Sequence, residues 1–188
     1  MLEQLLNLVR DNAQDAVVNN QAIPNEQNDA VIGEATHSIT DGLQQALAGG
    51  GFKNVLQLLG GQAGNAESHP VVNDISNNFM NSLMSKFGMD GSQAQSVAGS
   101  LIPTVMNKLI HKTNDAGDSS FDLQGIFNSL TGGKTSGLNL SSMLSSFGGG
   151  LDKDGDGDVD MQDVMGMLGG GQQGGGLGGM LKGFMGGK

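Results

Sequence analysis

The sequence has no cysteine, no tryptophan and no tyrosine, and phenylalanine occurs only seven times. The absence of cysteine excludes disulfide bonds, thiolate metal sites and a cysteine nucleophile. A core must therefore be built mainly from leucine, isoleucine, valine, methionine and alanine. Strands favour aromatic and β-branched side chains, so this composition favours helices over a sheet. We expect an all-α fold.

Basic residues are also scarce. Nine lysines and arginines face nineteen aspartates and glutamates, which gives a formal net charge of −10. A field of this sign repels nucleic-acid phosphates and anionic lipid surfaces, so we expect no nucleic-acid partner. The same scarcity argues against a membrane-surface protein that uses its glycine- and methionine-rich repeats, although this alternative stays open.

Long apolar runs are missing as well. Nowhere do eighteen apolar residues follow one another, so we expect no transmembrane helix. The first ten residues lack the basic start and long apolar stretch of a secretory signal peptide, and position 3 is an acid. A cytoplasmic location is the default expectation.

Apolar residues at three- and four-residue spacings predict four longer helices. The stripes cover residues 2–17, 31–47, 71–87 and 94–110. We expect Ser92 to cap the fourth helix, and Pro103 to kink or divide it because proline lacks the backbone N–H.

Shorter units with apolar residues at i, i+3, i+4 and i+7 recur, each followed by glycines. They cover residues 52–59, 123–130, 140–147, 161–168 and 177–184. Two-turn helices are marginal alone, so these units need a surface to lie on. Either they pack on the helical core and on each other, or their Leu/Met/Phe faces bind a partner protein or drive self-association. We divide the chain into a helical domain (1–112), a linker with short helical repeats (113–150) and a calcium-loop and Gly/Met-rich tail (151–188).

One segment carries a metal-binding pattern. Counted from Asp152, acids stand at positions 1, 3, 5, 7, 9 and 12 and a glycine stands at position 6: Asp152, Asp154, Asp156, Asp158, Asp160, Asp163 and Gly157. This spacing is that of an EF-hand loop, in which carboxylate and carbonyl oxygens converge on a calcium ion and the glycine permits a sharp turn. We expect calcium binding, with magnesium as a competitor, and folding of this segment coupled to the metal. The alternative is an acidic, solvated loop without a specific metal.

The pattern departs from an EF-hand at two points. Asp163 replaces the usual glutamate at position 12, so one methylene is lost and calcium binding is expected to be weaker than in a high-affinity site. Gly148, Gly149 and Gly150 separate the preceding helix from the loop. The segment from Leu151 to Leu168 therefore resembles one of the two calcium loops of dockerin modules. The resemblance implies ligands from Asp152, Asp154, Asp156, Asp163 and the Asp158 carbonyl, with Asp160 acting through water or in the second shell. It does not imply a cohesin-type partner.

The sequence shows no set of residues with the spacing of a catalytic site. His37, His69 and His111 are far apart and without metal-ligand spacing, and we interpret them as surface or capping residues. The glycine runs lack the Lys-Ser/Thr of a phosphate loop. A non-enzymatic calcium-binding protein with an interaction or scaffolding role is therefore the leading hypothesis, and an enzyme of unrecognised type is the alternative.

Residues 87–109 resemble the helical signature of the YidB-like bacterial proteins of unknown function. The segment reads FGMDGSQAQSVAGSLIPTVMNKL. The resemblance covers about residues 1–112, implies an all-helical domain and implies no activity. The acidic segment lies outside it.

Overall fold

The computed structural model describes residues 1–146. This part of the chain is built of helices and turns without a strand, which confirms the all-α fold. In chain order the α-helices are α1 (Leu2–Asn12), α2 (Asn28–Ala48), α3 (Phe52–Leu59), α4 (Pro70–Phe87), α5 (Gly91–Thr113), α6 (Leu123–Leu130) and α7 (Leu140–Ser146). A π-helical turn (Gln14–Val18) follows α1, and short 3₁₀ turns lie at Asn25–Gln27, Ala66–Ser68 and Ser119–Phe121.

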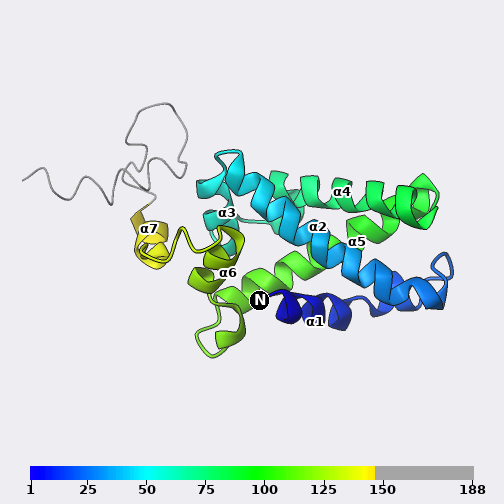
Figure 1. The fold of residues 1–188 in the computed structure, drawn as a ribbon, viewed down its shortest axis with the longest axis horizontal. Coiled ribbons are helices and arrows are strands. Elements are labelled where there is room, and N and C mark those ends of the chain that lie inside the picture. The colour runs from blue at the N-terminus through cyan, green and yellow to red at the C-terminus, as the bar shows by residue number, and fades with distance from the viewer. Residues whose placement is uncertain (147–188) are drawn as a thin grey trace, which may run out of the picture.

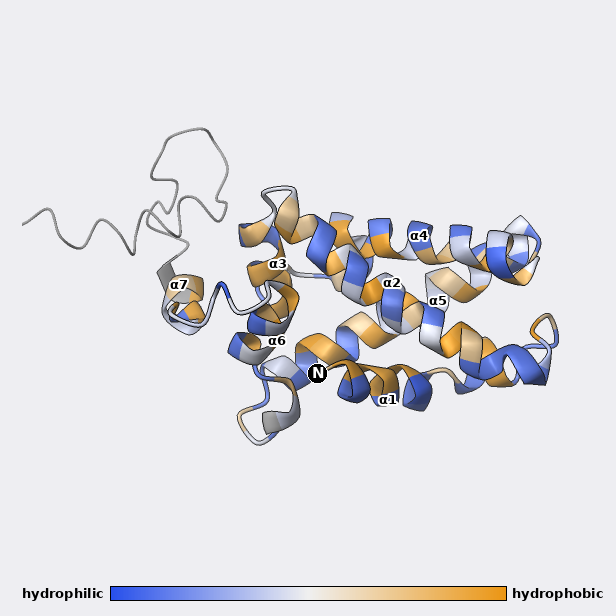
Figure 2. Ribbon diagram, in the orientation of Figure 1, coloured by the Kyte–Doolittle hydropathy of each residue, from blue (hydrophilic) through white to orange (hydrophobic). Residues whose placement is uncertain are grey.

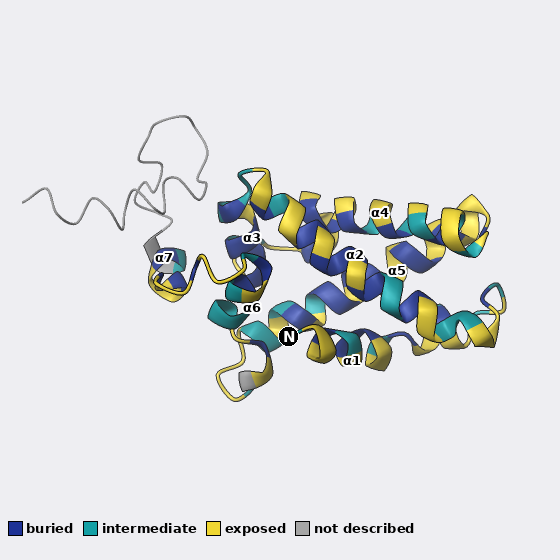
Figure 3. Ribbon diagram, viewed as in Figure 1, coloured by how far each residue is buried: buried dark blue, intermediate teal, exposed yellow. Residues whose placement is uncertain are grey.

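The four longer helices form an elongated bundle (Figure 1). α1 packs on α2 and α5, and α4 also packs on α2 and α5, so each helix has two neighbours. Their hydrophobic sides face inward in Figure 2, and the same sides are buried in Figure 3. The predicted stripe of α2 is buried along its whole length: Val31, Ala35, Ile39, Leu43 and Leu47. Burial of these stripes is the main force that holds the long helices together.

Helix α2 approaches α4 closely at Gly42. A Cβ at this position would overlap the Ile75 side chain of α4. By contrast, Gly33 in the same helix has no atom within 4 Å of where its Cβ would lie. Gly42 is therefore required by the packing between the two helices, whereas Gly33 is not.

The turn between α4 and α5 is defined by two capping residues. Gly88 ends α4 in the left-handed conformation, with φ of 68°, which glycine adopts without strain. Asp90 begins α5, because its carboxylate accepts hydrogen bonds from the backbone N–H groups of Ser92 (3.0 Å) and Gln93 (2.9 Å). The prediction that Ser92 caps this helix is therefore wrong. Its hydroxyl instead donates to Asp90 at 2.7 Å. These bonds lower the pKa of the Asp90 carboxyl.

Helix α5 continues through Pro103 as far as Thr113, so the division considered from the sequence is absent. Pro103 and the apolar residues on both sides of it, Leu101, Ile102, Val105 and Met106, are buried. Burial of the helix on both sides of Pro103 maintains one helix even though Pro103 cannot donate a backbone hydrogen bond.

The short repeats that fall within the described residues form α3, α6 and α7, and all three gather at one end of the bundle (Figure 1). Phe52 of α3 meets Phe127 of α6 edge-on, with 5.2 Å between ring centroids, and both side chains are fully buried. In α7, Leu140 is 1% and Met143 8% exposed. The packing interpretation of these three repeats is thus confirmed. The repeats at 161–168 and 177–184 lie outside the described residues.

The segment after α5 is tied to the bundle by polar contacts. Asn114 donates from its side chain to the carbonyl of Leu59 at 2.9 Å, which joins the ends of α3 and α5. Lys112 pairs with Asp118 at 2.6 Å, and this hydrogen bond is the main cause that lowers the pKa of Asp118 to about 2. Phe121 and residues of α6 and α7 belong to the same buried cluster as the long helices. The division into domains at residue 112 stays a prediction.

Candidate functional site

The predicted calcium ligands lie beyond the described part of the chain. Asp152, Asp154, Asp156, Asp158, Asp160 and Asp163 all fall within 147–188. Among residues 1–146 no group of three or more histidines, aspartates and glutamates is arranged to hold a metal ion. The calcium prediction therefore concerns the acidic segment alone.

The approach to the acidic segment is described. Helix α7 ends at Ser146, six residues before Asp152, and packs on α3 and α6. Its Leu144 lies so close to Gly60 that a Cβ there would overlap the leucine methyl groups. The chain therefore enters the acidic segment from a helix that is anchored on the bundle.

A polar groove follows the contact between α2 and α4. One cavity of about 370 Å³ is lined by ionisable residues that include Glu34, His37, Asp41 and Lys86. A second cavity of about 370 Å³ shares Gly42, Gln45 and Asn78 with it, so the groove continues along the two helices. We refer to it as the α2–α4 groove.

The charges in this groove are partly neutralised by an ion pair. The Lys86 amine donates to both Glu34 carboxylate oxygens, at 2.7 and 2.8 Å. Burial alone would raise the pKa of Glu34, but the hydrogen bonds from Lys86 and Ser82 outweigh it and the pKa is lowered. Glu34 is therefore an anion that is paired with Lys86. Because its pKa is lowered, it is a poor general base at neutral pH. The Lys86 side chain is 59% exposed, so solvent screens the pair.

His69 has the capping role that the sequence predicted. It precedes Pro70 at the start of α4, and its Nδ1 accepts a hydrogen bond from the backbone N–H of Val71 at 3.3 Å. Burial lowers the pKa of His69, which favours the neutral ring that can accept this bond. Its role is structural.

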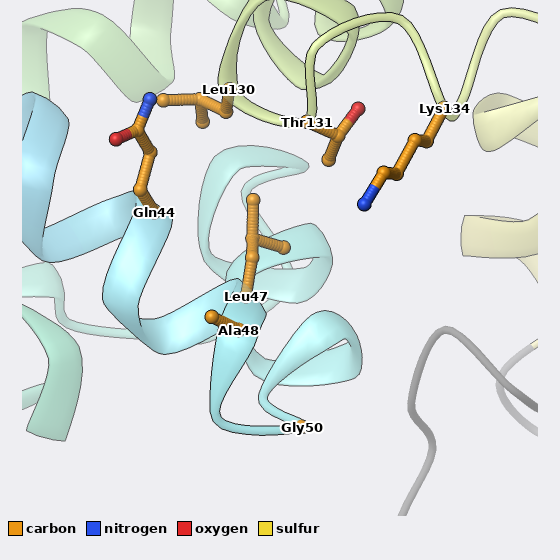
Figure 4. A pocket seen from close by; sticks show the side chains of 7 residues that line it. All are labelled: Gln44, Leu47, Ala48, Gly50, Leu130, Thr131 and Lys134. Carbon is orange, nitrogen blue, oxygen red and sulfur yellow. The ribbon is translucent and has the colours of Figure 1, made fainter.

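A second kind of hollow lies at the end of the bundle where the repeats gather. This end cavity, of about 300 Å³, opens between the last turn of α2 and the end of α6: Gln44, Leu47, Ala48, Gly50, Leu130, Thr131 and Lys134. In Figure 4 the side chains of Leu47 and Leu130 lie on opposite walls, and the Lys134 amine points toward the space between them. The walls of the cavity combine leucine and alanine side chains with the polar Gln44 and Thr131, and a lysine lies at its rim.

One wall of the end cavity is fixed by a buried threonine. Thr135 is fully buried, its hydroxyl donates to the Asn128 side chain at 2.8 Å, and its carbonyl accepts from the Gln124 side chain at 2.6 Å. These bonds hold the turn that carries Lys134 against α6. This network could not be predicted from the sequence, because residues 131–139 have no periodicity that would pair them with α6.

No family model matches the chain, and no curated protein or solved structure matches it either. The helices of the described part also include none that is long and apolar enough to cross a membrane.

Proposed function

We propose that this protein is a non-enzymatic calcium-binding protein with an interaction or scaffolding role, in which the ion orders the segment that follows the helical bundle. The observation that carries the proposal is the spacing of six aspartates between Asp152 and Asp163, with Gly157 at the turn position. Six carboxylates this close repel one another without a cation, and calcium accepts six to eight oxygen ligands. Magnesium, which prefers a smaller octahedral site, would compete.

The anchored position of α7 supports this proposal. Leu140 and Met143 are buried against the bundle, so the chain is held in place nine residues before the first predicted ligand. This anchor leaves only the residues after α7 for the ion to order. The bundle would thus act as a support for the metal-binding segment.

The resemblance of residues 87–109 to the YidB-like proteins has a physical basis in the turn between α4 and α5. Its signature begins at Phe87 and runs into α5, across the turn that Gly88 and Asp90 define. A left-handed glycine followed two residues later by an N-capping aspartate is what a tight connection between two packed helices requires. Gly88 and Asp90 are thus explained by folding alone, so the resemblance adds no activity to the proposed function.

A protein partner or a second copy would bind the repeats that do not pack on the bundle. The apolar faces of α3, α6 and α7 are already buried by packing within the chain. The Leu/Met/Phe faces of residues 161–168 and 177–184 follow the same spacing and come after the acidic segment. We infer that the interaction role falls to whichever of these two units does not pack on the bundle, and that calcium controls how that unit is presented.

Calorimetric titration of calcium into the full chain tests this function. We expect one site per chain, with affinity at least about tenfold weaker in Asp152→Ala and in Asp163→Ala, because each variant removes a ligand. Asp163→Glu is the matched control, since it restores the longer carboxylate and is expected to tighten binding. Titration without heat in the unaltered protein, or full retention of affinity in both alanine variants, would overturn the proposal.

A further inference from the structure

Three short repeats close one end of the bundle, yet the end cavity remains between α2 and α6. We propose that the repeat Met161–Leu168 docks in this cavity and continues the packing that α3, α6 and α7 begin. The inference deepens the proposed function, on which it rests, because it names the surface on which the calcium-ordered segment lies.

The three described repeats define what such a unit does in this protein. Each places apolar residues at i, i+3, i+4 and i+7, and the three helices that they form lie at this end of the bundle (Figure 1). The fit between them is close. Phe52 contacts Phe127, and Leu144 lies over Gly60, where even a Cβ would collide with it. The next unit repeats the same spacing with Met161, Val164, Met165 and Leu168.

The walls of the end cavity suit this occupant. Leu47 and Leu130 are the last leucines of α2 and α6, and they border the hollow from opposite sides (Figure 4). They are 9% and 7% exposed, so a helix with an aliphatic and thioether face would cover the small apolar surface that they still present, and methionine adapts to irregular surfaces of this kind. Lys134 at the rim provides the complementary charge for the acidic segment that directly precedes Met161.

Chain length places the unit within reach of the cavity. Met161 is fifteen residues beyond Ser146, and fifteen residues span at most about 50 Å. Helix α7, from which the chain departs, lies at the same end of the bundle as the cavity (Figure 1). A tether of this length gives an effective concentration that reaches the order of millimolar, so the chain's own segment outcompetes a second copy at micromolar protein concentration.

Of the two later repeats, the first is the better occupant. Residues 161–168 contain one glycine, Gly166, whereas residues 177–184 contain Gly178, Gly179 and Gly183. Each glycine lowers helix stability relative to alanine, so the last unit is the poorer helix. We assign the cavity to Met161–Leu168 for this reason.

The absence of cysteine from the sequence permits a direct test in the full chain. We would introduce the pair Ala48→Cys and Met165→Cys, which joins the cavity rim to the proposed occupant. Disulfide formation in a glutathione buffer then measures the effective concentration of the two thiols, with protease digestion and mass spectrometry to identify the link. One control pair moves the first cysteine to the opposite end of the bundle (Gln95→Cys), and another moves the second to the last repeat (Met180→Cys).

Docking predicts an effective concentration in calcium that is at least about tenfold higher for the Ala48–Met165 pair than for either control pair. Adding Val164→Asp to the Ala48–Met165 pair should reduce it to the control level. Equal values for all pairs would overturn the inference, and so would links that form between chains in proportion to protein concentration.

The same measurement in a chelator separates this inference from the proposed function. A link that needs calcium supports both. A link that forms equally in calcium and chelator supports docking and contradicts calcium control. Loss of the link in a protein that still binds calcium in the calorimeter contradicts docking alone.

Discussion

At the scale of single residues, helix ends are fixed by side chains that accept backbone hydrogen bonds. Asp90, Asp122 and His69 each cap the helix that follows, and Asn65 caps the short turn at Ala66–Ser68. The aspartate caps accept through a carboxyl oxygen, which keeps a lone pair whether or not the group is protonated. The histidine cap is different, because protonation of Nδ1 removes the lone pair that accepts from Val71.

The His69 cap predicts a pH-dependent stability. Its folded-state pKa is lowered below the usual value of 6.5, so the unfolded chain binds the proton more readily. The contribution of His69 is therefore fully present above pH of about 6.5 and is lost as the pH falls through the window below it. We expect His69→Ala to lose about 1 kcal/mol of unfolding free energy at pH 8.

His69→Asn is the matched control, since asparagine caps helices without titrating in this range. Urea denaturation of the three proteins between pH 5 and 8 checks the prediction. If the stability of the wild-type protein relative to His69→Asn does not decrease as the pH is lowered from 8 to 5, the His69 cap does not stabilise α4.

At the scale of elements, the close contact of α2 and α4 depends on Gly42. Gly42→Ala would gain helix propensity of up to about 1 kcal/mol but would place a methyl group inside the Ile75 side chain. Overpacking of this kind costs about 1–3 kcal/mol, so we expect a net loss of stability.

The same substitution at Gly33 serves as its control. Gly33 lies in the same helix with open space around it, so Gly33→Ala should stabilise the protein by up to about 1 kcal/mol. Chemical denaturation of both variants gives the comparison. Changes of the same sign would contradict the described packing of α2 on α4.

Helix α6 provides a second prediction at this scale, because it is short but belongs to the core. Phe127 is fully buried against Phe52, so Phe127→Ala should cost about 3–5 kcal/mol and shift the whole unfolding transition. Leu123→Ala, at a half-buried position of the same helix, should cost less. Thermal unfolding in which Phe127→Ala produces a separate early transition, with the main midpoint unchanged, would show that α6 is an independent unit.

The sequence predicted α2, α4 and α5 well, because their apolar stripes repeat at the helical period over four turns or more. The single first helix predicted over residues 2–17 is wrong, since α1 ends at Asn12 and a π-helical turn covers Gln14–Val18. The stripe of α4, for example, is buried at Val72, Ile75, Phe79 and Leu83. The location of the short repeats could not be predicted, since their spacing defines an apolar face but not the surface it meets. Hydrogen bonds from single polar side chains, such as Asn114 to the Leu59 carbonyl and Thr135 to the Asn128 side chain, leave no periodic signal in the sequence.

At the scale of the whole molecule, the chain combines a helical bundle that has an apolar core with a concentrated acidic segment. Six of its nineteen acidic residues lie between Asp152 and Asp163, outside the described residues. The candidate metal site was thus predicted entirely from sequence spacing, and it stays a prediction. What the structure adds is the anchor of α7 and the end cavity beside it.

Hydrogen exchange of the full chain, with calcium and with chelator, measures whether the ion orders the acidic segment. We expect calcium to slow exchange at least about tenfold in peptides from residues 151–168, because ion binding orders this segment. Peptides from α4, on the far side of the bundle from α1, should exchange equally in both conditions (Figure 1). Exchange in residues 151–168 that is the same with and without calcium would show that calcium does not order this segment.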